Sequence, residues 1–120
     1  WTATITEFEQ ALAGGRGPVK ARLLDQARLA GLGNLLVDEV LWRADLSPHR
    51  PAGLLDTDEV RRLRRVVRRV LDQMDRRGGS HTGDLFDARR PGGVCPRDGT
   101  GLRRATVGGR TTWWCPAHQS

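Results

Sequence analysis

Two short segments near the end of the chain carry residue types that bind metal ions. Residues 95–98 (CPRD) and 115–118 (CPAH) each place a second potential ligand three positions after a cysteine. This spacing lets a tight turn direct both side chains at one ion, as in zinc ribbons. The candidate ligands of a structural zinc ion are therefore Cys95, Asp98, Cys115 and His118. The set is unusual, because an aspartate is a harder donor than the cysteine and histidine ligands of common zinc sites.

Two alternatives to a metal site are open from these residues alone. Cys95 and Cys115 are the chain's two cysteines. They could form a disulfide across the intervening segment, although a cytosolic compartment disfavours one. Alternatively the segment carries no metal ion, and Trp113 and Trp114 pack in its place.

A glycine-rich segment, residues 30–34 (AGLGN), has the composition of a phosphate-binding turn. Gly31 and Gly33 let the backbone approach a partner closely, and amide groups stay free at the start of a following helix. Asn34 could add a donor through its side-chain amide. The alternative is an ordinary turn between two helices, with Asn34 as the N-cap of the second.

The hydrophobic pattern predicts four helices that position these segments. We expect them over about residues 6–13, 19–29 and 35–43, and from Asp56 or Thr57 to about Arg76. The arginines expected on the open face of the fourth helix are Arg61, Arg62, Arg65, Arg68, Arg69, Arg76 and Arg77. This face is as well explained by solvation alone as by a binding role.

The last part of the chain predicts a small β-hairpin. Residues 103–115 form two β-prone runs around Gly108 and Gly109, the residues of a tight turn. A hairpin of this size is not stable alone, so we expect a metal ion to hold it. The predicted fold is mainly α with a small β-hairpin: a helical module over 1–79, a linker loop over 80–94 and a zinc-finger-like hairpin over 95–120.

Charge is distributed unevenly along the chain. The 120 residues carry 20 basic and 14 acidic side chains, a net charge of +6. Residues 1–60 contribute −3 of this and residues 61–120 contribute +9, which predicts a polyanionic partner for the second half. No apolar run is long enough for a membrane helix. We find no nucleophile with a positioned base, and we assign no role to His49, Ser80 or His81.

In combination, these motifs resemble a known family. Residues 19–26 (VKARLLDQ), 30–34 (AGLGN) and 37–42 (VDEVLW) resemble the helix–two-turns–helix module of bacterial formamidopyrimidine-DNA glycosylases and endonuclease VIII-like enzymes. Residues 78–80 (GGS) resemble the family's next landmark. Residues 109–112 (GRTT), with Cys115 and Gln119, resemble its zinc-finger hairpin. The resemblance covers about residues 6–120.

The resemblance implies a function in DNA repair. It implies a helix–two-turns–helix bundle with a zinc-ribbon-like hairpin that binds damaged double-stranded DNA in the cytoplasm, at the nucleoid. Such enzymes bend the duplex and flip the damaged base out of the stack. The residues to which the resemblance assigns DNA binding are Lys20, Gly31, Gly33, Asn34, Arg110 and Thr111. Among them, Asn34 and Arg110 would contact the phosphates that flank the extruded nucleotide, and Lys20 would have a supporting role.

Three departures from the family pattern shape this expectation. The family's catalytic N-terminal proline and adjacent glutamate have no counterpart. Since the chain starts at Trp1 and its only methionine is Met74, we expect a catalytic N-terminal domain to precede it. Asp98 and His118 stand where the family has cysteines. Residues 81–94 are fewer than the family has there, which argues against assuming specificity for a guanine lesion.

We therefore expect the DNA-binding C-terminal fragment of a base-excision-repair DNA glycosylase and AP lyase, inactive by itself. Two alternatives come from other functional classes. One is a DNA- or RNA-binding module without enzymatic activity, since the same helical motif occurs in a ribosomal small-subunit protein. The other is a structural zinc module that binds a protein partner.

Overall fold

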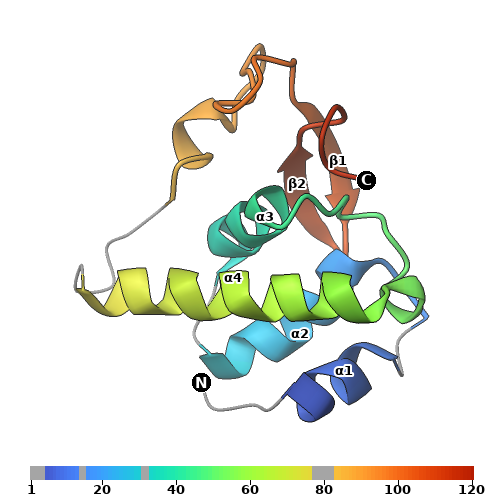
Figure 1. Ribbon diagram of the computed structural model, residues 1–120. Helices are drawn as coiled ribbons and strands as arrows, with labels where there is room; N and C mark the ends of the chain where they lie inside the picture. The colour runs from blue at the N-terminus through green and yellow to red at the C-terminus, as the bar shows by residue number, and fades with distance from the viewer. Residues whose placement is uncertain (1–4, 14–15, 31–32, 77–82) are drawn as a thin grey trace.

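Four helices and a two-stranded hairpin make up the part of the fold that the structure describes (Figure 1). The computed structural model describes residues 5–13, 16–30, 33–76 and 83–120. The elements in chain order are α1 (Ile5–Ala13), α2 (Val19–Ala30), α3 (Asn34–Arg43), the 3-10 turn η1 (Ala52–Leu54), α4 (Thr57–Arg76), the 3-10 turn η2 (Phe86–Ala88), β1 (Arg103–Val107) and β2 (Arg110–Trp114). The expected helices and hairpin are all present, and helix boundaries differ from the expected ones by at most one residue.

Helix α3 lies at the centre of the molecule. It packs against α2, α4 and β2, and residues 36–42 are all buried. The main hydrophobic core joins α3 to the apolar stripes of α1, α2 and α4. The residues of α4 that enter this core are Val60, Leu63, Val67 and Val70, with Val66 and Leu71 packed against it. The helical part therefore has a core of its own, separate from the hairpin.

A capping box begins helix α4. The Asp56 carboxylate accepts a hydrogen bond from the Glu59 backbone N–H at 2.7 Å, and Glu59 Oε1 accepts one from the Asp56 N–H at 3.0 Å. Two otherwise unsatisfied donors at the start of the helix are thus paired reciprocally. Glu59 also forms a two-pronged ion pair with Arg50, at 2.8 Å for each bond, which fixes the preceding loop to the helix.

The hairpin closes through a two-residue glycine turn. Val107 pairs with Arg110, and Gly108 and Gly109 have φ values of +62° and +76°. Positive φ at both positions is what a type I′ turn requires, and glycine adopts it without steric cost. A Cβ atom on Gly108 would lie 3.1 Å from Ala21 Cα, so the turn rests directly on the first residues of α2.

A second, smaller hydrophobic cluster lies where the hairpin meets α3. It consists of Trp42, Leu85, Cys95 and Cys115, with Leu102 packed against it. Leu85 belongs to the segment expected to be a linker loop, so this segment contributes to the packing. It is anchored by Glu39 Oε1, which accepts a hydrogen bond from the Leu85 N–H at 2.8 Å. No helix among the described residues is long and apolar enough to cross a membrane.

Candidate metal centre and phosphate-binding cleft

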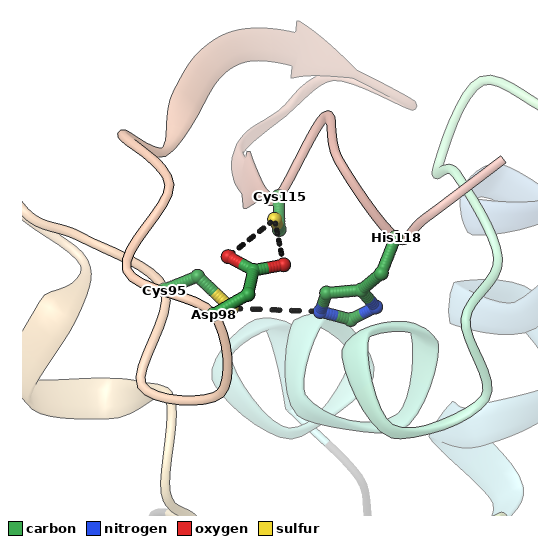
Figure 2. Close-up of side chains that lie close together, drawn as sticks. All are labelled: Cys95, Asp98, Cys115 and His118. Atoms are coloured by element: carbon green, nitrogen blue, oxygen red, sulfur yellow. Dashed lines mark hydrogen bonds between the residues drawn. The ribbon is translucent and has the colours of Figure 1, made fainter.

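The four residues predicted to bind metal converge in space (Figure 2). Cys95 and Asp98 come from the loop before β1, and Cys115 and His118 come from the turn after β2. Their ligand atoms all lie within 4.8 Å of one another. Cys95 Sγ is 3.5 Å from His118 Nε2, and Cys115 Sγ is 3.3 Å from Asp98 Oδ2.

These separations suit a tetrahedral metal site. With metal–ligand bonds of about 2.0–2.3 Å, two ligand atoms at tetrahedral positions lie about 3.5 Å apart. The Cys95–His118 and Cys115–Asp98 separations are close to this value. Two thiolates, an imidazole and a carboxylate are all accepted as zinc ligands. The cluster could therefore hold a metal ion without large movement of its side chains.

Two side chains from outside the hairpin support the cluster. Trp42 Nε1, on α3, donates a hydrogen bond to Cys95 Sγ at 3.2 Å. Asp45 Oδ1 lies 3.0 Å from His118 Nδ1, which leaves Nε2 of the same ring directed at Cys95. A carboxylate on the far ring nitrogen fixes the tautomer and orientation of a metal-binding histidine. Asp45 adopts φ +61°, the one positive φ among the described non-glycine residues.

The protonation of the cluster follows from its surroundings. Hydrogen bonds from Thr100, led by its backbone N–H at 2.9 Å, lower the pKa of Asp98 to about 2. Burial raises the pKa of the Cys115 thiol. The carboxylate is thus charged at neutral pH, and the thiol retains its proton until a cation stabilises the thiolate.

The alternatives to a metal site were a disulfide between the two cysteines and the packing of Trp113 and Trp114 in place of a metal ion. Both cysteines are free thiols in the structure, so it contains no disulfide between them. The ring contacts of Trp113 and Trp114 involve residues outside the ligand set. Arg104 lies over the Trp113 ring at 5.9 Å, and Trp114 makes an edge contact with His49 at 4.8 Å.

A shallow cleft joins the glycine-rich turn to the tip of the hairpin. Its volume is about 210 Å³. The residues that line it are Ala21, Leu24, Asp25, Gly33, Asn34, Gly108 and Arg110. Gly33 is the N-cap of α3, and no side chain caps this helix end. The alternative of Asn34 as N-cap is therefore wrong: Asn34 is the first residue of the helix. The free N–H groups of the first turn make this end favourable for an anion.

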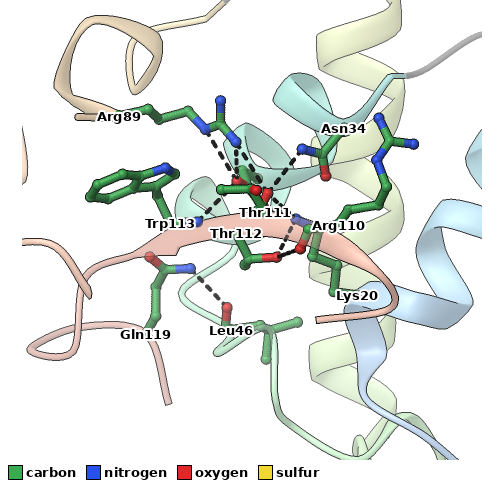
Figure 3. Close-up of polar contacts among 10 residues, drawn as sticks. Lys20, Asn34, Leu46, Arg89, Arg110, Thr111, Thr112, Trp113 and Gln119 are labelled. Atoms are coloured by element: carbon green, nitrogen blue, oxygen red, sulfur yellow. Dashed lines mark hydrogen bonds and ion pairs between the residues drawn. The ribbon is translucent and has the colours of Figure 1, made fainter. Parts of the chain in front are cut away.

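The side chain of Asn34 is tied to the hairpin (Figure 3). Its Nδ2 donates to the Thr111 carbonyl at 2.9 Å, and its Oδ1 is buried without a hydrogen-bond partner among the described residues. Arg110 is exposed at the start of β2. The carbonyl of Thr111 also accepts from Lys20 Nζ at 3.3 Å. Thr111 thus enters the site through its backbone, while Arg110 offers an exposed guanidinium.

Asp38 holds the hairpin against the helices. Its Oδ1 pairs with Lys20 Nζ at 2.7 Å, and its Oδ2 accepts from Arg89 Nη2 at 3.0 Å and from the Trp113 backbone N–H at 3.1 Å. Asp38 and Lys20 are both fully buried. Burial lowers the pKa of the Lys20 ammonium, and Asp38 opposes this change. Lys20 thus lies inside the molecule, where its ammonium group donates hydrogen bonds to Asp38 and Thr112. It does not face the cleft directly but stabilises the elements that form it.

Several expectations lie outside the described residues. Among these are Gly31 of the phosphate-binding set, the landmark at residues 78–80, and His81. Conversely, the sequence analysis assigned no role to Asp38, Asp45, Trp42 or Arg89, although Asp38 and Trp42 belong to the motif at residues 37–42. Asp38 could have been found from its position among the apolar residues of a predicted helix. A carboxylate buried there needs hydrogen-bonding or charged partners. No sequence pattern indicated the contacts of Asp45 and Trp42, because their partners His118 and Cys95 are distant in the sequence.

Together these features define a helix–two-turns–helix domain with a candidate metal-binding hairpin. Residues 2–84 match the family model described as "Formamidopyrimidine-DNA glycosylase H2TH domain", and the chain belongs to that family. The resemblance found in the sequence is thereby confirmed.

Similar proteins carry the same family name. The formamidopyrimidine-DNA glycosylase of Streptococcus pneumoniae serotype 4 is 38% identical over 91% of this chain and 45% of its own length. That of Thermus thermophilus is 41% identical over 93% of this chain and 48% of its own length. The chain thus spans about half the length of the curated relatives that it matches.

Solved structures share the fold. Lactococcus lactis Fpg in complex with DNA containing an abasic site has a TM-score of 0.82 and 30% identity, covering 98% of this chain and 47% of that one. MutM in complex with DNA containing carbocyclic 8-oxo-G has a TM-score of 0.83 and 32% identity, covering 98% and 46%. Both neighbours are bound to DNA.

Proposed function

We propose that this chain is the DNA-binding half of a base-excision-repair glycosylase and AP lyase, which grips the phosphates around a flipped, damaged nucleotide. The observation that carries the proposal is the cleft in which the N-terminus of α3, Asn34 and Arg110 meet. It combines a helix N-terminus, an amide and an exposed guanidinium, all of which favour phosphate. The DNA-bound Fpg neighbours support duplex DNA as the ligand.

Each residue contributes in its own way. Arg110 supplies the charge and a forked donor that matches phosphate oxygens. Asn34 supplies its second amide hydrogen and stands at the positive end of the α3 dipole. Gly33 leaves the backbone open at this point, since a Cβ there would meet no atom within 4 Å. Lys20 acts indirectly, by holding Thr111 and Thr112 in place.

We further propose zinc as the structural metal of Cys95, Asp98, Cys115 and His118. When bound, zinc would cross-link the loop before β1 to the turn after β2. This cross-link would fix the position of Arg110 relative to Asn34. Arg110 lies on β2, which leads into one metal-binding turn, and Asn34 lies on α3, which contacts Cys95 through Trp42. The chain contributes affinity, and the bond-breaking steps belong to the catalytic half of the whole enzyme.

The test compares two arginines of the same hairpin. Arg110 lies at the turn, and Arg103 is also exposed but pairs with Trp114 at the other end. We expect Arg110→Ala to weaken binding to an abasic-site duplex about tenfold and to reduce its salt slope by about one unit, because one phosphate contact is lost. Arg103→Ala should change affinity much less. If both variants bound as tightly as the parent chain in fluorescence anisotropy titrations, the phosphate role of Arg110 would be wrong.

A second measurement separates this function from the alternatives. A glycosylase half should prefer abasic or bent duplex over intact duplex, since its cleft holds a distorted backbone. Equal binding of double-stranded RNA would favour the general nucleic-acid module. Absence of any salt-dependent nucleic-acid binding would favour a module for protein partners.

A further inference from the structure

Helix α4 carries a second group of basic side chains that the cleft does not use. Arg61, Arg65, Arg68 and Arg69 are all exposed and lie at helical spacings of four, three and one residues, so they share one side of the helix. We call them the α4 arginine face. None of the four lines the cleft of Asn34 and Arg110.

The guanidinium groups of this face have no partner among the described residues. No hydrogen bond, ion pair or ring contact joins any of the four to another described side chain or carbonyl. Elsewhere Arg43, Arg50 and Arg89 each pair with a carboxylate. Arg62, which follows Arg61 on α4, also has a partner, because its Nε donates a hydrogen bond to the Ala44 carbonyl at 2.8 Å. The α4 arginine face is therefore an uncompensated group of cations within the described part of the chain.

The surface beside these arginines is hollowed. One depression, of about 680 Å³, is lined by Thr6, Asp58, Arg61, Arg62 and Arg65. A second, of about 210 Å³, is lined by Arg62, Arg65, Val66 and Arg69. Because Arg62 and Arg65 line both, the two depressions follow one another along the helix. The acidic side chains nearest to the face on α4 itself are Asp58 and Asp72, one towards each end.

The face is directed away from the cleft. The opposite side of α4 is buried against the core, and α3 lies between α4 and β2 (Figure 1). The α4 arginine face and Arg110 thus lie on different elements, with α3 between them. We propose that this face binds a second segment of DNA backbone, so that one chain can hold two duplexes at once. This inference goes beyond the single-duplex grip described above.

Charge and spacing favour a nucleic-acid backbone as the occupant. Residues 61 to 69 advance by about 12 Å along the helix, a length over which a duplex presents about seven phosphates. Four unpaired arginines in that length match a dense, repeating anion better than they match scattered carboxylates. Like charges at these spacings also repel one another, and bound phosphates would relieve that repulsion.

The experiment measures capture of one duplex by another. A short undamaged duplex is fixed to beads, the 120-residue chain is added, and retention of a second, fluorescent duplex is recorded. We expect the chain to retain it, and the variant R61Q/R65Q/R68Q/R69Q to reduce retention about tenfold or more, since four phosphate contacts are lost. Glutamine keeps a high helix propensity, so the variant should fold, which circular dichroism verifies. The control R61K/R65K/R68K/R69K keeps the charge and should retain the second duplex.

The outcomes separate this inference from the proposed function. Binding of a single abasic duplex by the glutamine variant should stay within about threefold of the parent, because Asn34 and Arg110 are intact. Undiminished capture by that variant, or sedimentation at one duplex per chain at saturation, would overturn the inference and leave the cleft untouched. Competition by poly-glutamate as strong as that by DNA of equal charge would overturn DNA as the occupant. Loss of binding in Arg110→Ala tests the proposed function alone.

Discussion

Single residues from outside the hairpin decide the geometry of the candidate metal centre. His118 reaches Cys95 through Nε2 only while its other ring nitrogen faces Asp45. Asp45 also contacts Arg97, so one carboxylate connects the loop after α3 to both metal-binding turns. The ligands belong to the hairpin, but their orientation depends on the helical part.

Asp45→Asn tests this dependence with little change in shape. Asparagine tolerates positive φ as aspartate does, so the backbone at +61° should persist. We expect zinc affinity to fall about 10- to 100-fold, because the carboxylate no longer orients the imidazole. Competition with a chromophoric chelator measures the affinity. The exposed Asp87→Asn is the control, and affinities within about twofold of each other in the two variants would contradict the role of Asp45.

The buried pair of Lys20 and Asp38 makes a second prediction at the residue scale. Lys20→Met leaves Asp38 Oδ1 without its cation, and breaking a buried ion pair on one side costs about 3–5 kcal/mol. We expect a loss of this order in the free energy of unfolding by urea, together with faster amide exchange at Trp113. Arg103→Met, an exposed substitution, should cost less than about 0.5 kcal/mol. A loss below about 1 kcal/mol for Lys20→Met would show that Arg89 alone satisfies Asp38.

At the scale of elements, the position of the hairpin on α2 depends on its turn. Gly108 and Gly109 both have positive φ, but only Gly108 approaches α2, where a Cβ would lie 3.1 Å from Ala21 Cα. A Cβ on Gly109 would meet no atom within 4 Å. Substitutions at these two glycines therefore distinguish the effect of backbone strain from the effect of the contact between the turn and α2.

We expect Gly108→Ala and Gly109→Ala to lose a similar stability of about 1–2 kcal/mol from the left-handed backbone. Only Gly108→Ala should also weaken binding to an abasic duplex, because the added methyl group pushes the turn, and Arg110 with it, away from Ala21. Thermal unfolding and anisotropy titrations of both variants provide the comparison. Equal affinities would mean that the contact with α2 does not position Arg110.

The elements also show what a sequence can and cannot predict. Helix α4 follows from its apolar stripe and capping box, and the glycine turn follows from residue types alone, since both depend on neighbours in the chain. The four candidate metal ligands follow from spacing within two short turns. Asp38 joins residues 18 and 75 positions away, Lys20 and Trp113. No local pattern predicts such a contact, because it exists only once α2, α3 and β2 are packed.

At the scale of the whole molecule, the core of the helices and the small cluster at the hairpin are stabilised in different ways. The hydrophobic core of the helices includes no residue of the hairpin. The second cluster includes Cys95 and Cys115 themselves, beside Trp42 and Leu85. A two-stranded hairpin with so small a cluster lacks the apolar burial for independent stability. Its folding free energy should therefore come largely from the metal ion.

Metal removal should accordingly unfold the chain in part. With a strong chelator, or in the variant Cys95→Ser, we expect the helical signal in far-ultraviolet circular dichroism to persist while tryptophan emission shifts to the red, because Trp42 and Trp113 lose their buried positions. Affinity for an abasic duplex should fall as far as in Arg110→Ala, since Arg110 loses its place beside Asn34. Zinc should restore the parent chain and leave Cys95→Ser unchanged. Loss of the helical signal in step with the tryptophan shift would instead mean that the helices depend on the hairpin, and that the molecule has one cooperative core.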